Sequence, residues 1–336
     1  MRSTPNSEIF SLLQDRLTPA LEEVERSLAQ QTRDERGVLT DLLSHLAQAG
    51  GKRLRPLLVL LCSQLGKPGE VSSDVIDAAV VVELTHLATL YHDDVMDSAP
   101  SRRGVPSTQM VWSNNQAILA GDLIFARASM LVAGLGPAMV FQHAKTFERL
   151  CAGQLDETMG PREGEDPLDH YLHVLADKTG SLVAQSARFG AELSGVPQDQ
   201  VDALYRFGDA VGVAFQIADD VLDVASDRET SGKTPGTDLR EGVDTLPILL
   251  LRQQAREGTI DADGQAILAG LEGDLTDDAA LDAVVQRLRR HPVLEQTRQM
   301  AFAWAGQAKD QLDIVEDGEV KQALLAFADM LVDRVA

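Results

Sequence analysis

Residues 73–97 read SDVIDAAVVVELTHLATLYHDDVMD, and this stretch decides the fold. As far as Leu90 it is apolar almost all round, which predicts a helix buried at the centre of a helical protein. It ends in Asp93, Asp94 and Asp97. Residues i and i+4 share one face of a helix, so Asp93 lines up with Asp97, and the two carboxylates repel each other unless a cation binds them. We therefore expect a buried helix that ends in a metal site.

A second stretch repeats this design. Residues 211–218 are apolar and run into Asp219, Asp220 and Asp223, again with an i, i+4 pair. The chain is rich in acids, so one such pattern can arise by chance, whereas two are much less expected. The acidic pair at 277–278 is different, because we expect it to begin a helix, where carboxylates complement the helix dipole. Packed as neighbours, the two buried helices would present both Asp clusters at the mouth of one cavity.

Composition favours one large all-α domain over residues 1–336. Hydrophobic residues make up 44% of the 336 residues and aromatic residues only 4%, and helical periodicity covers most of the chain without an alternating strand pattern. The expected helices cover residues 9–31, 38–65, 71–97, 107–135, 138–159, 168–193, 198–227 and 245–256, with several more up to residue 335.

Charge and cysteine content restrict the partners and the compartment. The formal net charge of −22 argues against nucleic acid and against an anionic membrane surface. Cys62 and Cys151 lie in apolar helical contexts, so we expect buried thiols and a cytoplasmic protein. The longest uncharged apolar runs are too short to cross a bilayer, which predicts a soluble chain that does not span a membrane.

Cations are scarce, so their clusters are informative. Gly50-Gly51-Lys52-Arg53-Leu54-Arg55-Pro56 places three cations at a helix start, which indicates a phosphate site, although a solvated loop would read the same way. Arg102-Arg103-Gly104 follows the first Asp cluster, and arginine forks can grip diphosphate oxygens or pair with nearby acids. Residues 228–242 are polar and Gly-rich, and we interpret them as a mobile flap beside the second cluster.

The order of these pieces resembles the trans-isoprenyl diphosphate synthases of the long-chain type, over most of the chain. The resemblance implies an all-α bundle of long helices around a central cavity, the isoprenoid synthase type of fold. It rests on Gly-Gly-Lys-Arg-Leu-Arg-Pro at 50–56, His86, the first Asp cluster with Arg102-Arg103-Gly104, Gly121-Asp122, Lys178-Thr179, Gln216-Ile217-Ala218 before the second Asp cluster, Gly232-Lys233, Gly236-x-Asp238-Leu239 and Thr245-Leu246-Pro247.

The resemblance implies a role for each matching residue. Asp93 and Asp97 would bind two Mg²⁺ ions and Asp219 a third, three per active site, with Asp94, Asp220 and Asp223 as further ligands or as supporting residues. Isopentenyl diphosphate would be held by Lys52, Arg55, His86 and Arg103, and the allylic diphosphate by Arg102, Lys178, Thr179, Gln216 and Lys233. Without the resemblance, His86 would read as a satisfied core histidine.

The implied reaction needs charge neutralisation more than a protein base. The C–O bond to diphosphate breaks only if the departing charge is neutralised, which metal ions and fixed cations can do. The resemblance assigns stabilisation of the allyl cation to Lys178, Thr179 and Gln216 and proton collection to the released diphosphate. One departure is Val243, because the family often has a lysine there, so one contact to the allylic diphosphate is expected to be missing.

The residues before Asp93 bear on product length. Thr85, Ala88 and Thr89 are small, and the resemblance implies that they line an open tunnel, whereas the alternative is that they allow close helix packing. A deep tunnel implies an all-trans product of about C35 to C50. We expect its fate to be a quinone side chain, such as that of menaquinone.

Partners and alternatives complete the expectation. Apolar central helices favour a homodimer, and product release would involve transient membrane contact. The alternatives are a shorter-chain farnesyl or geranylgeranyl diphosphate synthase, a class I terpene cyclase, or one subunit of a two-component synthase.

Overall fold

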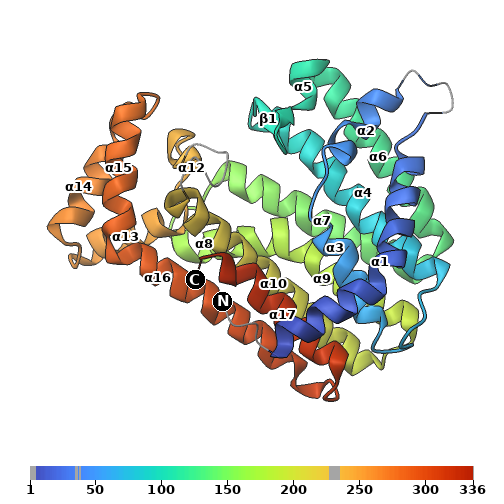
Figure 1. Ribbon diagram of the computed structural model, residues 1–336. Helices are drawn as coiled ribbons and strands as arrows, with labels where there is room; N and C mark the ends of the chain where they lie inside the picture. The colour runs from blue at the N-terminus through green and yellow to red at the C-terminus, as the bar shows by residue number, and fades with distance from the viewer. Residues whose placement is uncertain (1–4, 35–36, 38, 227–234, 336) are drawn as a thin grey trace. The chain divides into compact units, whose positions relative to one another are not determined.

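The computed structural model describes residues 5–34, 37, 39–226 and 235–335 (Figure 1). The expected all-α class is confirmed, because helices make up nearly all of the regular structure in these residues. The elements are α1 (Pro5–Gln31), α2 (Thr40–Gln48), α3 (Leu54–Ser63), α4 (Ser73–Met96), β1 (Ser101–Arg102), β2 (Val105–Pro106), α5 (Thr108–Val111), α6 (Asn114–Gly134), α7 (Pro137–Met159), α8 (Pro167–Leu175), η1 (Ala176–Gly180), α9 (Ser181–Ser194), α10 (Gln198–Ala225), α12 (Thr237–Arg240), α13 (Leu246–Glu257), α14 (Ala262–Leu271), α15 (Asp278–Arg290), α16 (Pro292–Asp310), η2 (Gln311–Ile314), α17 (Glu319–Val332) and η3 (Asp333–Val335).

Three of the expected helices are broken, each for a local reason. The helix expected over 38–65 stops at Gly50 and Gly51, whose φ angles are 91° and 154°, and restarts as α3. The helix expected over 107–135 is interrupted at Ser113, whose hydroxyl accepts a hydrogen bond from Gln116 N and begins α6. The helix expected over 168–193 contains a π-helical turn, η1, between α8 and α9.

A small hairpin was not predicted. The antiparallel pair β1–β2 joins Ser101 to Pro106 and Arg102 to Val105. Its turn is closed by Arg103 and Gly104, whose φ angles are 53° and 78°. Strands of two residues are too short to produce a period-2 pattern in the sequence, so pattern analysis misses them.

Backbone contacts divide the chain into two compact units, which we describe separately. The first comprises Met1–Arg149, Ser181–Gly208 and Gln311–Ala326, and the second comprises Leu150–Gly180, Asp209–Asp310 and Phe327–Ala336. Each unit is assembled from three stretches of the chain. The expectation of a single domain stays a prediction.

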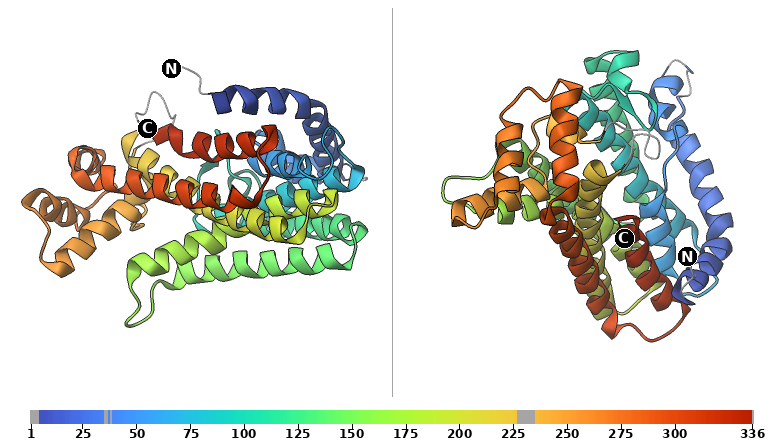
Figure 2. Two further views of the ribbon diagram at one scale, coloured as in Figure 1. Left: turned by 90° about the horizontal axis from the view of Figure 1, so that it is seen from below. Right: turned by 60° about the vertical axis from the view of Figure 1, so that its left-hand side comes forward.

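The core of the first unit is built around α4. This helix packs against α1, α3, α6 and α9, and its residues Val80, Val81 and Val82 are fully buried, as its apolar sequence predicts. Burying a valine side chain contributes about 1.5–3 kcal/mol, so this run is a large share of the stabilisation of the unit. In the right-hand view of Figure 2, α1 lies along α3.

The second unit has its own core. The last turns of α10 pack with α13, α15 and α16 through buried residues such as Val213, Ile217, Leu251 and Leu288. Figure 1 shows α14 and α15 side by side, and α15 begins at Asp277, whose side chain accepts a hydrogen bond from Ala280 N. The interpretation of residues 277–278 as a helix start is therefore confirmed.

One expectation about apolar residues is corrected, for Cys151, and the expectation that no helix spans a membrane stays a prediction. Among the described residues, α6 is long and apolar enough to cross a membrane by length and composition, with a third of its most apolar window buried. A search for uncharged runs missed it because Asp122 and Arg127 interrupt the sequence. Cys62 is buried as expected, but Cys151 is exposed, since it lies next to the buried Leu150 and is rotated by about 100° around α7.

Candidate active site

The first Asp cluster lies where α4 ends. Asp97 caps the helix, with its backbone N–H bonded to Asp93 O at 2.8 Å. Asp93 is partly exposed and Asp97 is exposed, whereas Asp94 is fully buried. The i, i+4 pair is therefore the part of the cluster that solvent, and hence a hard cation, can reach.

Asp94 faces the protein and holds Arg102. Arg102 Nε donates to Asp94 Oδ1 at 2.7 Å, while Asp94 Oδ2 is buried without a hydrogen-bond partner. Burial raises the pKa of Asp94, and the guanidinium of Arg102 opposes that shift. Gln109 Nε2 also donates to the Asp94 carbonyl at 2.8 Å. Asp94 was expected to be either a further metal ligand or a supporting residue. This geometry favours the second role, because the side chain positions an arginine.

The cationic residues expected to bind isopentenyl diphosphate come together around Gly51. A Cβ added to Gly51 would lie 3.0 Å from Arg53 Nη1 and 3.1 Å from Arg103 Cζ, so a close approach of two guanidinium groups requires glycine here. Arg103 Nη1 donates to Leu46 O at 2.9 Å and also to Gly50 O. Arg55 Nε is buried without a hydrogen-bond partner. Lys52, which follows Gly51 in the sequence, is exposed. The loop thus presents donors at the start of α3, where the backbone N–H groups of a helix are also unsatisfied.

His86 lies close enough to this cationic group for the arginines to change the protonation of its imidazole. Burial, followed by the positive charges of Arg55 and Arg103, lowers the pKa of His86 well below 6.5. The imidazole is therefore neutral at physiological pH and can donate one hydrogen bond to an anion.

The residues expected to face the allyl cation lie on the π-helical turn and on α10. Thr179 Oγ1 lies 3.4 Å from Gln216 Oε1, which brings these two predicted residues together. Gly180 and Gly212 permit this approach, since a Cβ on Gly212 would lie 2.6 Å from Gly180 Cα. Lys178 forms an ion pair with Glu157 of α7. A π turn inside α-helical sequence often marks a functional site, and here it carries both Lys178 and Thr179.

The second Asp cluster divides in the same way as the first. Asp220 is buried and accepts hydrogen bonds from Leu246 N at 3.0 Å and from the Tyr171 hydroxyl, and burial raises its pKa to about 7. Asp223 accepts hydrogen bonds from the backbone N–H groups of residues 237 and 238 at 3.2 and 3.4 Å. Both side chains anchor neighbouring segments. Asp219 is partly exposed, unlike Asp220, and it lies 2.9 Å from Arg334.

The flap expectation is only partly testable. Residues 228–234 of the expected flap, with Gly232 and Lys233, lie outside the described residues. Residues 237–240 form the short helix α12, so the expectation of non-helical structure was wrong there, because Gly236 in the left-handed region begins a helical turn. Val243, at the position where the resemblance led us to expect a lysine, is 47% exposed.

Sequence reasoning missed Tyr171, Glu157 and Arg334. None of them belongs to a motif, and each contacts a predicted residue only through folding: Tyr171 contacts Asp220, Glu157 contacts Lys178, and Arg334 contacts Asp219. The one available signal was the Thr245-Leu246-Pro247 segment, since a proline at a helix start leaves the preceding N–H free to bind a carboxylate.

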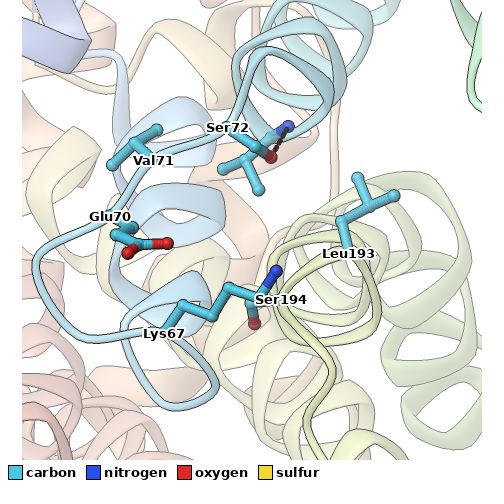
Figure 3. A pocket seen from close by; sticks show the side chains of 7 residues that line it. Lys67, Glu70, Val71, Ser72, Leu193 and Ser194 are labelled. Carbon is cyan, nitrogen blue, oxygen red and sulfur yellow. Dashed lines mark hydrogen bonds between the residues drawn. The ribbon is translucent and has the colours of Figure 1, made fainter.

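A cavity of about 360 Å³ lies elsewhere in the first unit (Figure 3). It is lined by Lys67, Glu70, Val71, Ser72, Val75, Leu193 and Ser194. Ser72 and Val75 belong to the beginning of α4, whereas Asp93 belongs to its end. The cavity is therefore not at the Asp cluster.

Metal binding by protein side chains alone is not indicated in the described part of the chain. Within residues 5–34, 37, 39–226 and 235–335, no group of three or more His, Cys, Asp or Glu side chains is arranged to hold a metal ion. Pairs of carboxylates fit Mg²⁺ that keeps waters and shares phosphate oxygens. Asp93 and Asp97 belong to the first unit and Asp219 to the second, and the expectation that both clusters line one cavity stays a prediction.

Comparisons with known proteins give one answer about the family. A family model described as polyprenyl synthetase matches residues 36–284. The chain is 44% identical over 311 residues to the nonaprenyl diphosphate synthase of Mycobacterium tuberculosis, which covers 93% of this chain and 91% of that protein. It is 36% identical over 321 residues to heptaprenyl diphosphate synthase component 2 of Geobacillus stearothermophilus, with 95% and 96% covered.

Solved structures agree. The geranylgeranyl pyrophosphate synthase of Corynebacterium glutamicum, complexed with calcium and isoprenyl diphosphate, matches with a TM-score of 0.83 at 42% identity, over 96% of this chain and 97% of that one. A decaprenyl diphosphate synthase from Rhodobacter capsulatus matches with a TM-score of 0.84 at 32% identity, over 97% and 99%. The chain therefore belongs to the polyprenyl synthetase family, the trans-isoprenyl diphosphate synthases.

Proposed function

We propose that this synthase condenses an allylic diphosphate with successive isopentenyl diphosphates to a long-chain all-trans polyprenyl diphosphate of about C35 to C50. The observation that carries the proposal is that the partly exposed Asp93 and the exposed Asp97, at the end of α4, belong to the same compact unit as the cationic group around Gly51, in a chain of this family. The chain is a prenyltransferase, and the names of its nonaprenyl and decaprenyl relatives support the long product.

Asp93, Asp97 and Asp219 are the residues that would hold divalent ions. Each of them is at least partly exposed, unlike Asp94 and Asp220, and carboxylate oxygen is a ligand type that Mg²⁺ binds. The Corynebacterium structure contains calcium together with isoprenyl diphosphate, which supports a divalent metal beside diphosphate. We propose three Mg²⁺ ions per active site, which neutralise the departing diphosphate when bound.

The cationic group would bind isopentenyl diphosphate. Arg55 and Arg103 supply fixed positive charge, Lys52 an exposed ammonium group, and neutral His86 one donor. Arg102, held by Asp94, would bind the allylic diphosphate, and Lys178 would also bind it if the diphosphate displaced Glu157. Lys233 is proposed for the same site from the resemblance alone.

Carbocation chemistry would then take place beside Thr179 and Gln216. The Thr179 hydroxyl and the Gln216 side-chain oxygen, 3.4 Å apart, would stabilise the allyl cation through their negative dipoles, and exclusion of water would protect it. The double bond of isopentenyl diphosphate attacks the cation, a proton leaves, and the released diphosphate collects it. This reaction needs no protein base.

The tunnel residues are placed differently from one another. Thr85 and Ala88 are fully buried, and the Ala88 carbonyl lies 3.2 Å from a Cβ added at Gly121 of α6, so the packing alternative is supported for Ala88. Thr89 is partly exposed and is the better candidate to line the growing chain. The Corynebacterium relative is named for a geranylgeranyl product, which keeps the shorter-chain alternative under test.

We also propose that the chain forms a homodimer through one apolar surface. Its exposed residues are Ile118, Leu119 and Met130 of α6 with Val140 and Phe141 of α7. Exposed apolar residues on a chain of net charge −22 favour a second copy over an anionic membrane, because the net charge repels an anionic surface. Membrane contact would then be transient and limited to product release.

The proposal also covers the location of the enzyme and the fate of its product. We propose a cytoplasmic enzyme whose product becomes a quinone side chain. A terpene cyclase needs only one diphosphate site, so the cationic group around Gly51 argues against it. The component 2 relative from Geobacillus keeps a two-subunit synthase as the remaining alternative.

Metal-dependent incorporation of labelled isopentenyl diphosphate by the purified chain tests the proposal. Asp93→Asn is expected to abolish incorporation while the protein stays folded, because the exposed carboxylate pair is lost. Asp277→Asn is the matched control, since Asp277 only begins α15. Equal activity of the two variants would refute the metal assignment.

A further inference from the structure

Glu83 is a buried carboxylate beneath the cationic group. It lies on α4, one turn before His86, and only 2% of it is exposed. Arg53 Nη1 donates to Glu83 Oε1 at 2.8 Å, which forms a largely buried ion pair. A buried carboxylate is retained only if it is paired, so this contact needs an explanation beyond packing.

Arg53 connects Glu83 to two further elements. Its Nε donates to Glu25 Oε1 of α1 at 2.5 Å, and its Nη2 donates to Ala47 O in the last turn of α2 at 3.1 Å. Its backbone is in the left-handed region, with φ of 49°, which a residue with a side chain adopts at a cost. The fork of Arg53 therefore holds the loop at residues 50–53 in a conformation that the loop alone would not prefer.

Glu83 also affects Arg55 and Arg103. Burial lowers the pKa of both arginines, and the charge of Glu83 opposes this, whereas Arg103 further lowers the pKa of Arg55 and Arg53 further lowers that of Arg103. The guanidinium groups repel one another, and a negative charge beneath them opposes this repulsion. Glu83 is fixed on a buried helix, so its charge stays in place when an anion binds above.

We propose that Glu83 is a positioning residue that holds Arg53, Arg55 and Arg103 in place to receive the diphosphate of isopentenyl diphosphate. The inference rests on the proposed function, because it assigns that substrate to the cationic group. Arginine side chains that are already held in place lose less conformational freedom when the substrate binds. Loss of this order should therefore weaken the affinity for isopentenyl diphosphate in particular.

Steady-state kinetics of Glu83→Gln test the proposal, with the thermal unfolding midpoint measured in parallel. We expect the KM for isopentenyl diphosphate to rise about tenfold, because misplaced binding groups weaken substrate positioning. The KM for the allylic diphosphate and kcat should change less than twofold. Glu25→Gln is the matched control: it removes the exposed partner of Arg53, and its KM values should stay near those of the wild type.

Two further variants separate positioning from simple stability. Glu83→Asp keeps the charge with a shorter reach, and its KM for isopentenyl diphosphate should lie between those of the wild type and Glu83→Gln. The double variant Glu83→Gln/Arg53→Gln should be no worse than Glu83→Gln alone, because residues that act as one unit have non-additive effects. If Glu83→Gln does not fold, the Glu83→Asp measurement decides.

The outcomes distinguish the inference from the proposed function. Wild-type turnover with an unchanged KM for isopentenyl diphosphate in both Glu83 variants would overturn the inference alone. A lower unfolding midpoint with equal changes in both KM values would also overturn it, since that is the result of a structural role. A wild-type chain that neither binds nor consumes isopentenyl diphosphate would overturn the proposed function, and the inference with it.

Discussion

Arg334 Nη2 lies 2.9 Å from Asp219 Oδ1, and the guanidinium of Arg334 stacks 4.5 Å from the centre of the Phe215 ring. The terminal helix η3 thus places a cation on the carboxylate that we expect to bind metal. Arg334 and a metal ion would therefore compete for the carboxylate of Asp219.

Arg334→Gln is therefore expected to lower the Mg²⁺ concentration for half-maximal activity. A partly exposed ion pair contributes about 0.5–1 kcal/mol, which corresponds to a change of about two- to fivefold. Rates measured across a Mg²⁺ titration give the answer. Arg298→Gln, which removes an ion pair with Glu295 on α16, should leave the titration unchanged. A higher Mg²⁺ requirement in Arg334→Gln would contradict the competition.

His86 predicts a pH dependence of stability in the first unit. Burial lowers the pKa of His86 in the folded state well below 6.5. Below pH 6.5 the unfolded chain therefore binds a proton at this histidine, whereas the folded chain does not. The stability is fully present above pH 6.5 and is lost as the pH falls below it, by up to about 1.4 kcal/mol per pH unit.

Urea unfolding of the wild type and His86→Gln between pH 5 and pH 7 tests this prediction, and the wild type should lose more free energy of unfolding on acidification. His173→Gln, at an exposed position, should keep the wild-type slope. Parallel slopes for the wild type and His86→Gln would rule out the charge-excluding environment.

Thr89→Phe should shorten the product by several isoprene units, because a ring at this partly exposed position obstructs the proposed tunnel. Thr89 is a better test than the fully buried Ala88, where a large side chain would also overpack the contact with α6. Chromatography of the dephosphorylated products measures the length. Thr89→Ser keeps a small side chain and should keep the wild-type distribution, and an unchanged length in Thr89→Phe would place the tunnel elsewhere.

Leu119→Glu should weaken the proposed dimer. Leu119 is 65% exposed on α6, and a charge buried at an apolar interface costs several kcal/mol, so the dissociation constant should rise at least about tenfold. Analytical ultracentrifugation of the variant and of Leu12→Glu, a similarly exposed leucine on α1, makes the comparison. A dimer that is equally stable in both variants would assign the contact to another surface.

The sequence predicts those features that depend on local pattern. The buried helix before Asp93 and the helix start at Asp277 are confirmed, because apolar periodicity and capping are properties of neighbouring residues. The π turn at Lys178 and the hairpin that carries Arg102 were missed, since both depend on contacts with other elements.

The division of labour within each Asp cluster is also a tertiary property. Asp94 and Asp220 have the same residue type as Asp93 and Asp219, yet Asp94 binds Arg102 and Asp220 binds Leu246 N. Only the fold decides which carboxylates face solvent. Arg53 and Glu83 are 30 residues apart in the sequence, and no motif spacing predicts their contact.

Product analysis of the purified chain tests the central claim most directly. The chain is incubated with Mg²⁺, farnesyl diphosphate and labelled isopentenyl diphosphate, and the dephosphorylated products are separated by length. We predict all-trans products of about C35 to C50, made by this chain without a second protein. Products that end at C20, or incorporation that appears only when a second subunit is added, would contradict the account.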